Sequence, residues 1–277
     1  MDLRVLLIQN NAIVGNKEAT LNNIDTLLTK YAGESFDLIV LPEVFAIGWQ
    51  CKDFQAQAEQ LEKSETIEFL KNIALTFKSI VIGGSIIIKS DNGEYLNTCP
   101  VISKEGKLVT TYDKIHLFSH IDAEENKYIK SGNELKILDL GFTKIGLSIC
   151  YDIRFPEIYR AYSRNGVEIF INVAAWSKTK PEHWDIMHKA RAIENQCFMI
   201  VANQTGKITN NGHNLGHSMV LDPWGSTIIE LKEEESCAKC IINTEQLKEL
   251  RKTFPLLKDR KDTGNNCFKI KEININD

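Results

Sequence analysis

The sequence has no long apolar run and no excess of basic charge. No segment of its 277 residues approaches the roughly 18 consecutive apolar residues of a membrane span, so we expect no membrane partner. Lysine and arginine total 33 against 37 aspartates and glutamates, a formal charge of −4, and nucleic acid is not expected as a partner because phosphate binding needs a basic face. Met1–Arg4 leads directly into a strand-like run, so we also expect no signal peptide.

Glycine and proline are scarce as well, and the 16 glycines and 6 prolines exclude a fibrous or low-complexity protein. The cysteine count is odd and the spacing irregular, which fits a reducing compartment, and we expect a cytoplasmic protein. The seven cysteines are Cys51, Cys99, Cys150, Cys197, Cys237, Cys240 and Cys267. Cys237 and Cys240 resemble half of a zinc site, but no second pair follows at the required spacing. We therefore expect neither a metal nor a cofactor.

Short β-rich runs alternate with helical patterns along the chain. Helices are predicted over residues 17–31 and from Ser64, Pro156 and Pro181 onward. Strands are predicted at 4–8, 37–41, 79–88, 98–103, 108–111, 143–150, 167–173, 198–202, 219–221, 227–229 and 240–242. Helices join some strands and hairpins join others, which predicts an α/β layered fold with a mixed sheet. No linker or composition break is present, so one domain over residues 1–277 is expected.

Two local predictions concern the second half of the chain. In the helix from Pro181, the apolar stripe Ile186, Ala190, Ile193 and Cys197 is expected to face the core. The segment after Glu249 is rich in lysine and arginine and is expected to be a surface tail, with at most one short edge strand over residues 270–275.

Cys150 stands out because it ends an apolar strand and is followed at once by polar residues and a proline that opens a helix. At such a turn a thiol is presented at the strand end, where backbone N–H groups can stabilise a thiolate or an oxyanion. The alternative is that Cys150 is simply a small buried hydrophobe, as most cysteines are. Glu43, just past a buried strand and Pro42, and Lys114, near another strand end, are each unremarkable alone. Together the three supply a base, a cation and a nucleophile.

The chain order and surrounding motifs resemble the nitrilase superfamily of carbon–nitrogen hydrolases, from Val5 to about Asp262. The matching segments are Leu41–Glu43, Tyr112–Phe118, Ile149–Glu157, Arg191–Asn195 and Gly216–Gly225. The resemblance implies a four-layer α-β-β-α sandwich, assembled as a homodimer or a higher homo-oligomer. It also implies that Glu43 is a general base, Lys114 stabilises the tetrahedral intermediate and Cys150 is the nucleophile. A second glutamate is implied in the following loop, where Glu125 fits better than its neighbour Glu124.

Within the superfamily, the segments Cys150–Pro156 and Pro181–Trp184 resemble the ω-amidase branch, which deaminates ω-amides of dicarboxylates such as α-ketoglutaramate and succinamate. Arg154 either binds the substrate carboxylate through its planar fork or forms an ion pair with Glu157 or Asp152. The backbone N–H of Tyr151 is expected to bind the oxyanion. Phe45, Trp49, Phe118 and Trp176 are expected to line the pocket.

The resemblance leaves several functions open. On the same triad, the enzyme could cleave N-carbamoyl amino acids or nitriles, or it could be a catalytically silent member that binds a small acid. A papain-like pair of Cys150 with His213 or His217 is a rival catalytic arrangement. The expected reaction is cysteine-dependent hydrolysis of a small carboxylate-bearing amide by water, releasing ammonia through a thioester.

Overall fold

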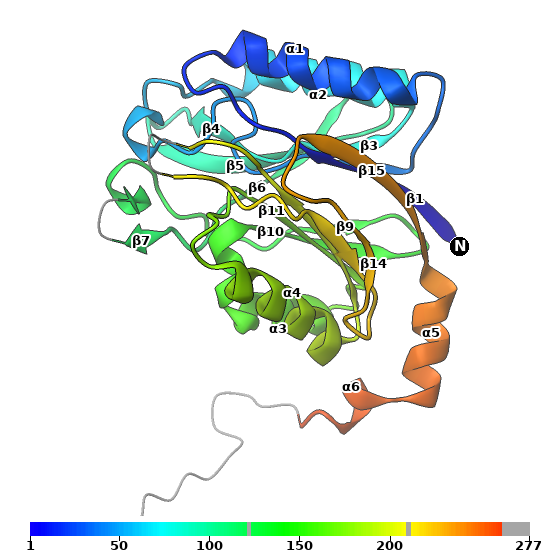
Figure 1. Cartoon of the computed structure of the whole chain (residues 1–277). Helices are drawn as coiled ribbons and strands as arrows, with labels where there is room; N and C mark the ends of the chain where they lie inside the picture. The colour runs from blue at the N-terminus through cyan, green and yellow to red at the C-terminus, as the bar shows by residue number, and fades with distance from the viewer. Residues whose placement is uncertain (121–122, 209–211, 262–277) are drawn as a thin grey trace, which may run out of the picture.

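In the computed structural model, which describes residues 1–120, 123–208 and 212–261, two β-sheets lie face to face between two layers of helices (Figure 1). The first sheet has the order β15-β1-β2-β3-β5-β4, with β6 paired to β5. The second has the order β14-β13-β12-β11-β10-β9. Helices α1 and α2 cover the first sheet, and α3 and α4 cover the second. The predicted α-β-β-α sandwich is confirmed.

The elements follow the predicted order with small shifts at their ends. The first sheet contains β1 (Asp2–Gln9), β2 (Leu38–Val40), β3 (Ile80–Ile82), β4 (Ile86–Lys89), β5 (Tyr95–Ile102), β6 (Leu108–Asp113) and β15 (Ser236–Asn243). The second contains β9 (Ile137–Asp139), β10 (Lys144–Ile149), β11 (Ile169–Ala174), β12 (Phe198–Asn203), β13 (Met219–Leu221) and β14 (Thr227–Glu230). The helices are α1 (Lys17–Leu28), α2 (Glu65–Phe77), α3 (Pro156–Arg164), α4 (Pro181–Asn195), α5 (Thr244–Thr253) and α6 (Leu256–Asp259). A small two-stranded ribbon, β7 (Ser119–His120) and β8 (Ala123–Glu124), lies between β6 and β9, where no helix or strand is predicted.

The apolar runs of the central strands are continuous because both faces of each sheet are buried. In β1, Val5 and Leu7 belong to the core between the two sheets, whereas Leu6 and Ile8 pack under α1 and α2. Such two-sided burial is expected for strands that pair in parallel, as β1, β2 and β3 do. Helix α2 begins at Ser64, whose side chain accepts a hydrogen bond from the Ile67 N–H.

The predicted apolar stripe is wrong for Ile186 and Ile193 on α4, whereas Cys197, beyond the end of this helix, is fully buried in the core. Ile186 and Ile193 are 63% and 46% exposed, and the face of α4 that packs on the sheet carries Trp184, His188 and Arg191. These polar side chains are buried because each has a partner: His188 Nε2 lies 3.2 Å from Asn172 Oδ1, and Arg191 donates to the Ile153 carbonyl. A pattern that counts only apolar residues therefore selects the opposite face.

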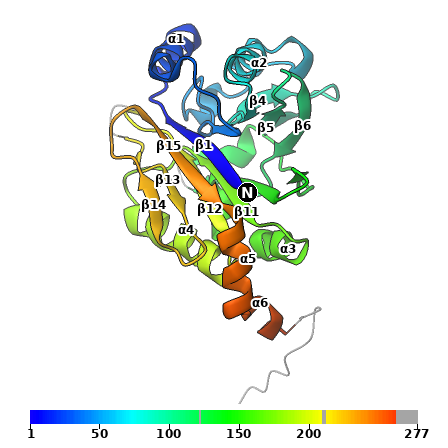
Figure 2. The same ribbon diagram turned by 90° about the vertical axis from the view of Figure 1, so that its right-hand side faces the viewer.

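The segment after Glu249 is also more ordered than predicted. It continues α5, whose Leu247 and Leu250 are buried and whose first turn is capped by the Asn243 side chain. Helix α5 follows β15 out of the first sheet and lies near the end of the second at which β11 and β12 begin (Figure 2), where Arg251 donates to the Gln196 carbonyl. The proposed edge strand over residues 270–275 lies outside the described residues. Within the described part of the chain, no helix is both long and apolar enough to cross a bilayer.

Candidate active site

Cys150 begins a tight 3-10 turn, Cys150–Arg154, directly after β10 of the second sheet. Its backbone φ of +44° lies in the left-handed region, which is strained for a residue with a side chain. The buried carboxylate of Asp152 holds the turn, because it accepts hydrogen bonds from the Ile149 N–H (2.9 Å) and the Tyr112 hydroxyl (2.7 Å). The turn therefore presents the Cys150 side chain at the strand end, as the sequence predicts.

Glu43 is held at the corresponding end of the first sheet, three residues after β2. The backbone here is tightly packed: a Cβ at Gly84 would lie 1.9 Å from the Pro42 carbonyl oxygen, so only glycine fits. The next residue, Val44, has a φ of +41°, and its N–H donates to Ser85 Oγ. Gln204 donates to the Glu43 carbonyl at 2.6 Å, which ties this turn to the second sheet.

The side chains of Glu43, Lys114 and Glu125 form one fully buried cluster. Lys114 Nζ lies 2.8 Å from Glu43 Oε1 and 2.9 Å from Glu125 Oε2. Asn97, in β5, donates through Nδ2 to the Oε1 atoms of Glu43 (2.9 Å) and Glu125 (3.3 Å). The Ala175 N–H of the second sheet donates to Glu43 Oε2 at 2.9 Å. Both carboxylate oxygens of Glu43 are therefore held by hydrogen bonds at the interface between the two sheets.

The structure distinguishes between the two candidate glutamates in the loop. Glu125 is buried, contacts Lys114 and accepts a hydrogen bond from the Phe118 N–H at 2.7 Å. Glu124 is a surface residue that pairs with Lys127. Of the two, Glu125 is the residue within reach of the candidate catalytic groups.

Burial and charge set the protonation of this cluster. Burial alone would lower the pKa of Lys114, but the carboxylates of Glu125 and Glu43 outweigh it and the pKa is raised, so the ammonium stays charged. Burial raises the pKa of Glu125, against the opposing effect of Lys114. Burial also raises the pKa of the Cys150 thiol, the Glu43 charge raises it further, and Lys114 opposes the shift. At neutral pH the site therefore rests with a thiol and needs a base to form the nucleophile.

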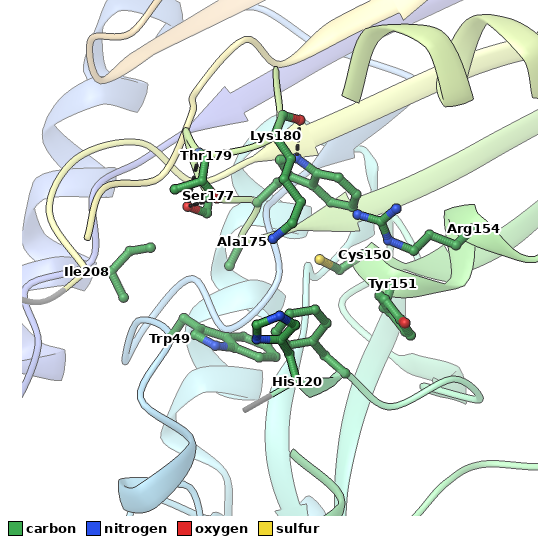
Figure 3. Close-up of a pocket in the computed structure, with 12 residues that line it drawn as sticks. Trp49, His120, Cys150, Tyr151, Arg154, Ala175, Ser177, Thr179, Lys180 and Ile208 are labelled. Carbon is green, nitrogen blue, oxygen red and sulfur yellow. Dashed lines mark hydrogen bonds between the residues drawn. The ribbon is translucent and has the colours of Figure 1, made fainter. Parts of the chain in front are cut away.

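A pocket of about 240 Å³ opens over Cys150 (Figure 3). Its size lies below the roughly 300–1,000 Å³ typical of drug-sized ligand sites, which restricts it to small molecules. The lining residues are Trp49, Phe118, His120, Cys150, Tyr151, Arg154, Ala175, Trp176, Ser177, Thr179, Lys180 and Ile208. Tyr151, Arg154, Phe118, Trp49 and Trp176 therefore lie where the sequence predicts. Phe45 does not line this pocket, because its fully buried ring packs against Phe69 beneath the α1–α2 layer.

The guanidinium carbon of Arg154 lies among aromatic rings, 4.7 Å from the Trp176 ring centre and 5.5 Å from that of Tyr151. Its Nη1 atom lies 3.2 Å from His183 Nδ1. No carboxylate within the described ranges forms an ion pair with it, and Asp152 is occupied by the turn of Cys150. The structural ion pair is therefore not formed, and the guanidinium is available to a ligand.

The rival pairing of Cys150 with His213 or His217 has no support in the geometry. His217 lies 2.6 Å from Glu230 Oε1, and neither His213 nor His217 lines the pocket. Within the residues that the structure describes, no group of three or more metal-binding side chains is arranged to hold an ion.

Several residues of the site are absent from the sequence-based predictions: Asn97 in the buried cluster, and His120, Ala175, Ser177, Thr179, Lys180 and Ile208 in the pocket lining. Asn97 lies in a strand 54 positions from Glu43, and an asparagine there carries no local signal of its role. Lys180 precedes Pro181 at the start of α4 and resembles any solvent-facing lysine. The contact of Asn97 with Glu43 and the position of Lys180 in the pocket arise only when the chain folds.

A buried Glu–Lys–Glu cluster close to a cysteine at the ends of the strands brings together a carboxylate, a cation and a thiol, the groups that covalent hydrolysis can use as base, stabiliser and nucleophile. The carbon–nitrogen hydrolase family matches residues 4–252, and the chain belongs to this family. It is therefore an enzyme that hydrolyses carbon–nitrogen bonds other than peptide bonds.

Known relatives narrow the branch. The chain is 36% identical over 233 residues to the 2-oxoglutaramate amidase of Paenarthrobacter nicotinovorans, and the aligned region covers 81% of this chain and 78% of that relative. It is 31% identical over 252 residues to omega-amidase NIT2 of Danio rerio, with 89% and 90% covered. The crystal structure of Saccharomyces cerevisiae Nit3, a member of branch 10 of the nitrilase superfamily, matches with a TM-score of 0.86, 29% identity and 94% and 97% coverage. The chain lies in the ω-amidase-like branch of the nitrilase superfamily.

Proposed function

We propose that the enzyme hydrolyses the terminal amide of a small carboxylate-bearing substrate, such as 2-oxoglutaramate or succinamate, and releases ammonia. The observation that carries the proposal is the guanidinium of Arg154, which forms no ion pair with a described carboxylate and lines a small pocket directly over Cys150. Arginine binds carboxylates in a bidentate manner, and an acid held there would direct its other end toward the thiol. Relatives named for amidase activity on 2-oxoglutaramate support the same substrate class.

In the proposed mechanism, Glu43 takes the proton of the Cys150 thiol as the sulfur attacks the amide carbon. A base is required because the thiol pKa is raised, so little thiolate is present at neutral pH. The carbonyl oxygen becomes an oxyanion, which Lys114 and the backbone N–H of Tyr151 stabilise. Glu125 keeps the Lys114 ammonium charged and oriented through two hydrogen bonds of 2.9 and 3.0 Å.

The intermediate then collapses. The carbon–nitrogen bond breaks, the proton held by Glu43 passes to the leaving nitrogen, and ammonia departs from a thioester on Cys150. Glu43 next takes a proton from water, and the resulting hydroxide attacks the thioester. The thiolate leaves, recovers its proton, and the acid is released.

The mechanism predicts that Cys150→Ala abolishes turnover and that Cys150→Ser retains below about 1% of it, because a hydroxyl is a weaker nucleophile at this site. Ammonia release would be measured with a carboxylate-bearing amide, an N-carbamoyl amino acid and a nitrile. Intact-protein mass after rapid quenching would reveal the thioester on wild-type protein only.

Unchanged ammonia release by Cys150→Ala would contradict the mechanism. Turnover of only the carbamoyl compound or only the nitrile would keep the triad and replace the proposed substrate. If no substrate turns over while small acids still bind, the chain is a catalytically silent member of its family.

We also propose that the enzyme is a homodimer formed by one domain over residues 1–277. The support is an exposed apolar patch consisting of Ile193 on α4, Trp224 in the β13–β14 turn and Phe254 after α5, which are 46%, 57% and 47% exposed. Their proximity is direct: the Trp224 and Phe254 rings stack at 5.6 Å, and a Cβ at Gly225 would lie 2.7 Å from Ile193. Exposed patches of this kind mark interaction surfaces.

A reducing compartment such as the cytoplasm is proposed for the same enzyme. The six cysteines in the described ranges are all free, and the proposed nucleophile must be a thiol to attack.

A further inference from the structure

The pocket over Cys150 is positively charged. Its twelve lining residues include two side chains with a full positive charge, Arg154 and Lys180, and no carboxylate. This contrasts with the whole chain, in which acidic residues outnumber basic ones. Because a small pocket with low-dielectric walls strengthens the field of such charges, it favours anionic ligands.

The backbone of Lys180 is held in place by two tryptophans. Its carbonyl accepts a hydrogen bond from Trp176 Nε1 at 3.0 Å and another from the Trp184 N–H at 3.3 Å. Both indoles are buried in the core beside the pocket. The residue therefore leaves the loop at a defined point, and its side chain extends toward Cys150 while Arg154 reaches in from another side (Figure 3).

The ammonium of Lys180 has no ionic partner within the described ranges. It lies over the Phe118 ring, whose centre is 5.9 Å from Nζ. Lys178, two residues earlier in the same loop, differs in this respect, because its Nζ pairs with Glu233 Oε2 at 2.6 Å outside the pocket. The charge of Lys178 is thus balanced by Glu233, whereas the charge of Lys180 is available to a ligand in the pocket.

We infer that Lys180 is a specificity-determining residue, whose ammonium binds the carboxylate of the substrate together with Arg154. This inference rests on the proposed function. The two cations bind a carboxylate in different ways. The planar guanidinium of Arg154, between aromatic rings, can bind both carboxylate oxygens at once, and the flexible Lys180 adds a point charge from a second direction. The substrate class is an amide whose acyl part ends in a carboxylate, and neutral amides of equal length lack a partner for either cation.

The test compares Lys180→Met with wild type on succinamate and on the neutral amide butyramide. We expect KM for succinamate to rise about 10- to 100-fold, since a hydrogen bond to a charged group is lost, and kcat/KM for butyramide to stay within about twofold. Lys180→Arg should recover most of the loss because it keeps the charge. Lys178→Met is the matched control and should behave as wild type.

A second readout does not depend on turnover. Calorimetric binding of succinate would be measured in the Cys150→Ala background with and without Lys180→Met, and the added substitution should weaken binding about 10- to 100-fold. An unchanged succinate affinity, an equal loss on butyramide, or the same loss in Lys178→Met would overturn the inference. If wild type releases no ammonia from any amide, the proposed function fails, and the binding experiment still decides the role of Lys180.

Discussion

Asn97 is a neutral donor shared by two buried carboxylates. Its single amide group reaches both Glu43 and Glu125, and its own Oδ1 atom has no hydrogen-bond partner within the described structure. A buried acceptor without a partner is destabilising, by about 1–3 kcal/mol in typical cases. The arrangement therefore favours the orientation of the carboxylates over the local stability of the asparagine.

We predict that Asn97→Asp lowers kcat more than about 100-fold, because it places a third carboxylate against the first two. Asn97→Leu adds no charge, so its kcat should fall less than that of Asn97→Asp. The acidic limb of its kcat/KM profile should shift to higher pH. The shift follows because the pKa of Glu125, which burial already raises, rises further when its carboxylate loses a donor that favours the charged form. Both pH profiles would be measured with the same amide substrate.

Asn92→Asp, in the exposed β4–β5 turn, is the matched control for this pair of variants. It introduces the same charge on the same hairpin and should leave the profile unchanged. Equal losses in Asn92→Asp and Asn97→Asp, or an unshifted profile in Asn97→Leu, would remove Asn97 from the positioning of the carboxylates.

At the residue scale, Cys150 stands out by its position after a strand, whereas Glu43 and Lys114 are selected only together with it, by the order and segments that resemble the nitrilase superfamily. Local motifs cannot reveal Asn97 or Lys180, whose partners lie far away in sequence and come close only on folding. They also misplace Phe45, since an aromatic residue beside Glu43 can point either to the pocket or to the core.

At the scale of elements, α4 is attached to the second sheet by a polar network. His188 Nδ1 lies 2.6 Å from the Trp184 carbonyl oxygen, Asn172 donates to Ser148 Oγ at 3.0 Å, and the Tyr159 hydroxyl lies 2.7 Å from the same oxygen. Burial lowers the pKa of His188 to about 3. The imidazole is therefore neutral in the folded protein at pH 7.

This histidine links the docking of α4 to pH. Because its pKa is about 6.5 when unfolded and about 3 when folded, the unfolded chain binds more protons between these values. Its contribution to stability is complete above pH 6.5 and is lost as the pH falls toward 3, by at most about 1.4 kcal/mol per pH unit. His188→Gln should thus be less stable at pH 7 but lose less stability between pH 7 and pH 4.

Urea denaturation at several pH values would measure this difference. His183→Gln, an exposed histidine on the same helix, serves as control and should keep the wild-type slope. Parallel curves for wild type and His188→Gln would show that His188 does not carry the pH dependence.

Strands and hairpins follow from apolar runs and turn residues, and most element positions are correct within a few residues. The buried face of α4 could not be predicted, because its polar residues become tolerable in the core only through partners on β11 and in the Cys150–Arg154 turn. The order of α5 depends in the same way on contacts with distant strands.

At the scale of the whole molecule, the apolar patch of Ile193, Trp224 and Phe254 predicts the quaternary structure. Trp224→Glu places a charge at its centre and should convert the proposed dimer to a 31.4 kDa monomer at micromolar concentration. Light scattering after size exclusion would measure the mass. Ile241→Glu, at a 59% exposed position on β15, is the control and should not change it.

A wild-type protein that is already monomeric would refute the dimer. A dimer that persists in Trp224→Glu but dissociates in Ile241→Glu would move the interface to the β15 edge.

The reacting groups are divided between the two sheets: Glu43 and Lys114 come from the first, and Cys150 and the Ala175 N–H come from the second. Either half, folded alone, would hold an incomplete set. A chain with both sheets formed but not yet packed together would look native by far-ultraviolet circular dichroism and still be inert. Recovery of ammonia release during refolding therefore reports when the two sheets pack against each other. Spectroscopy of secondary structure cannot detect this step.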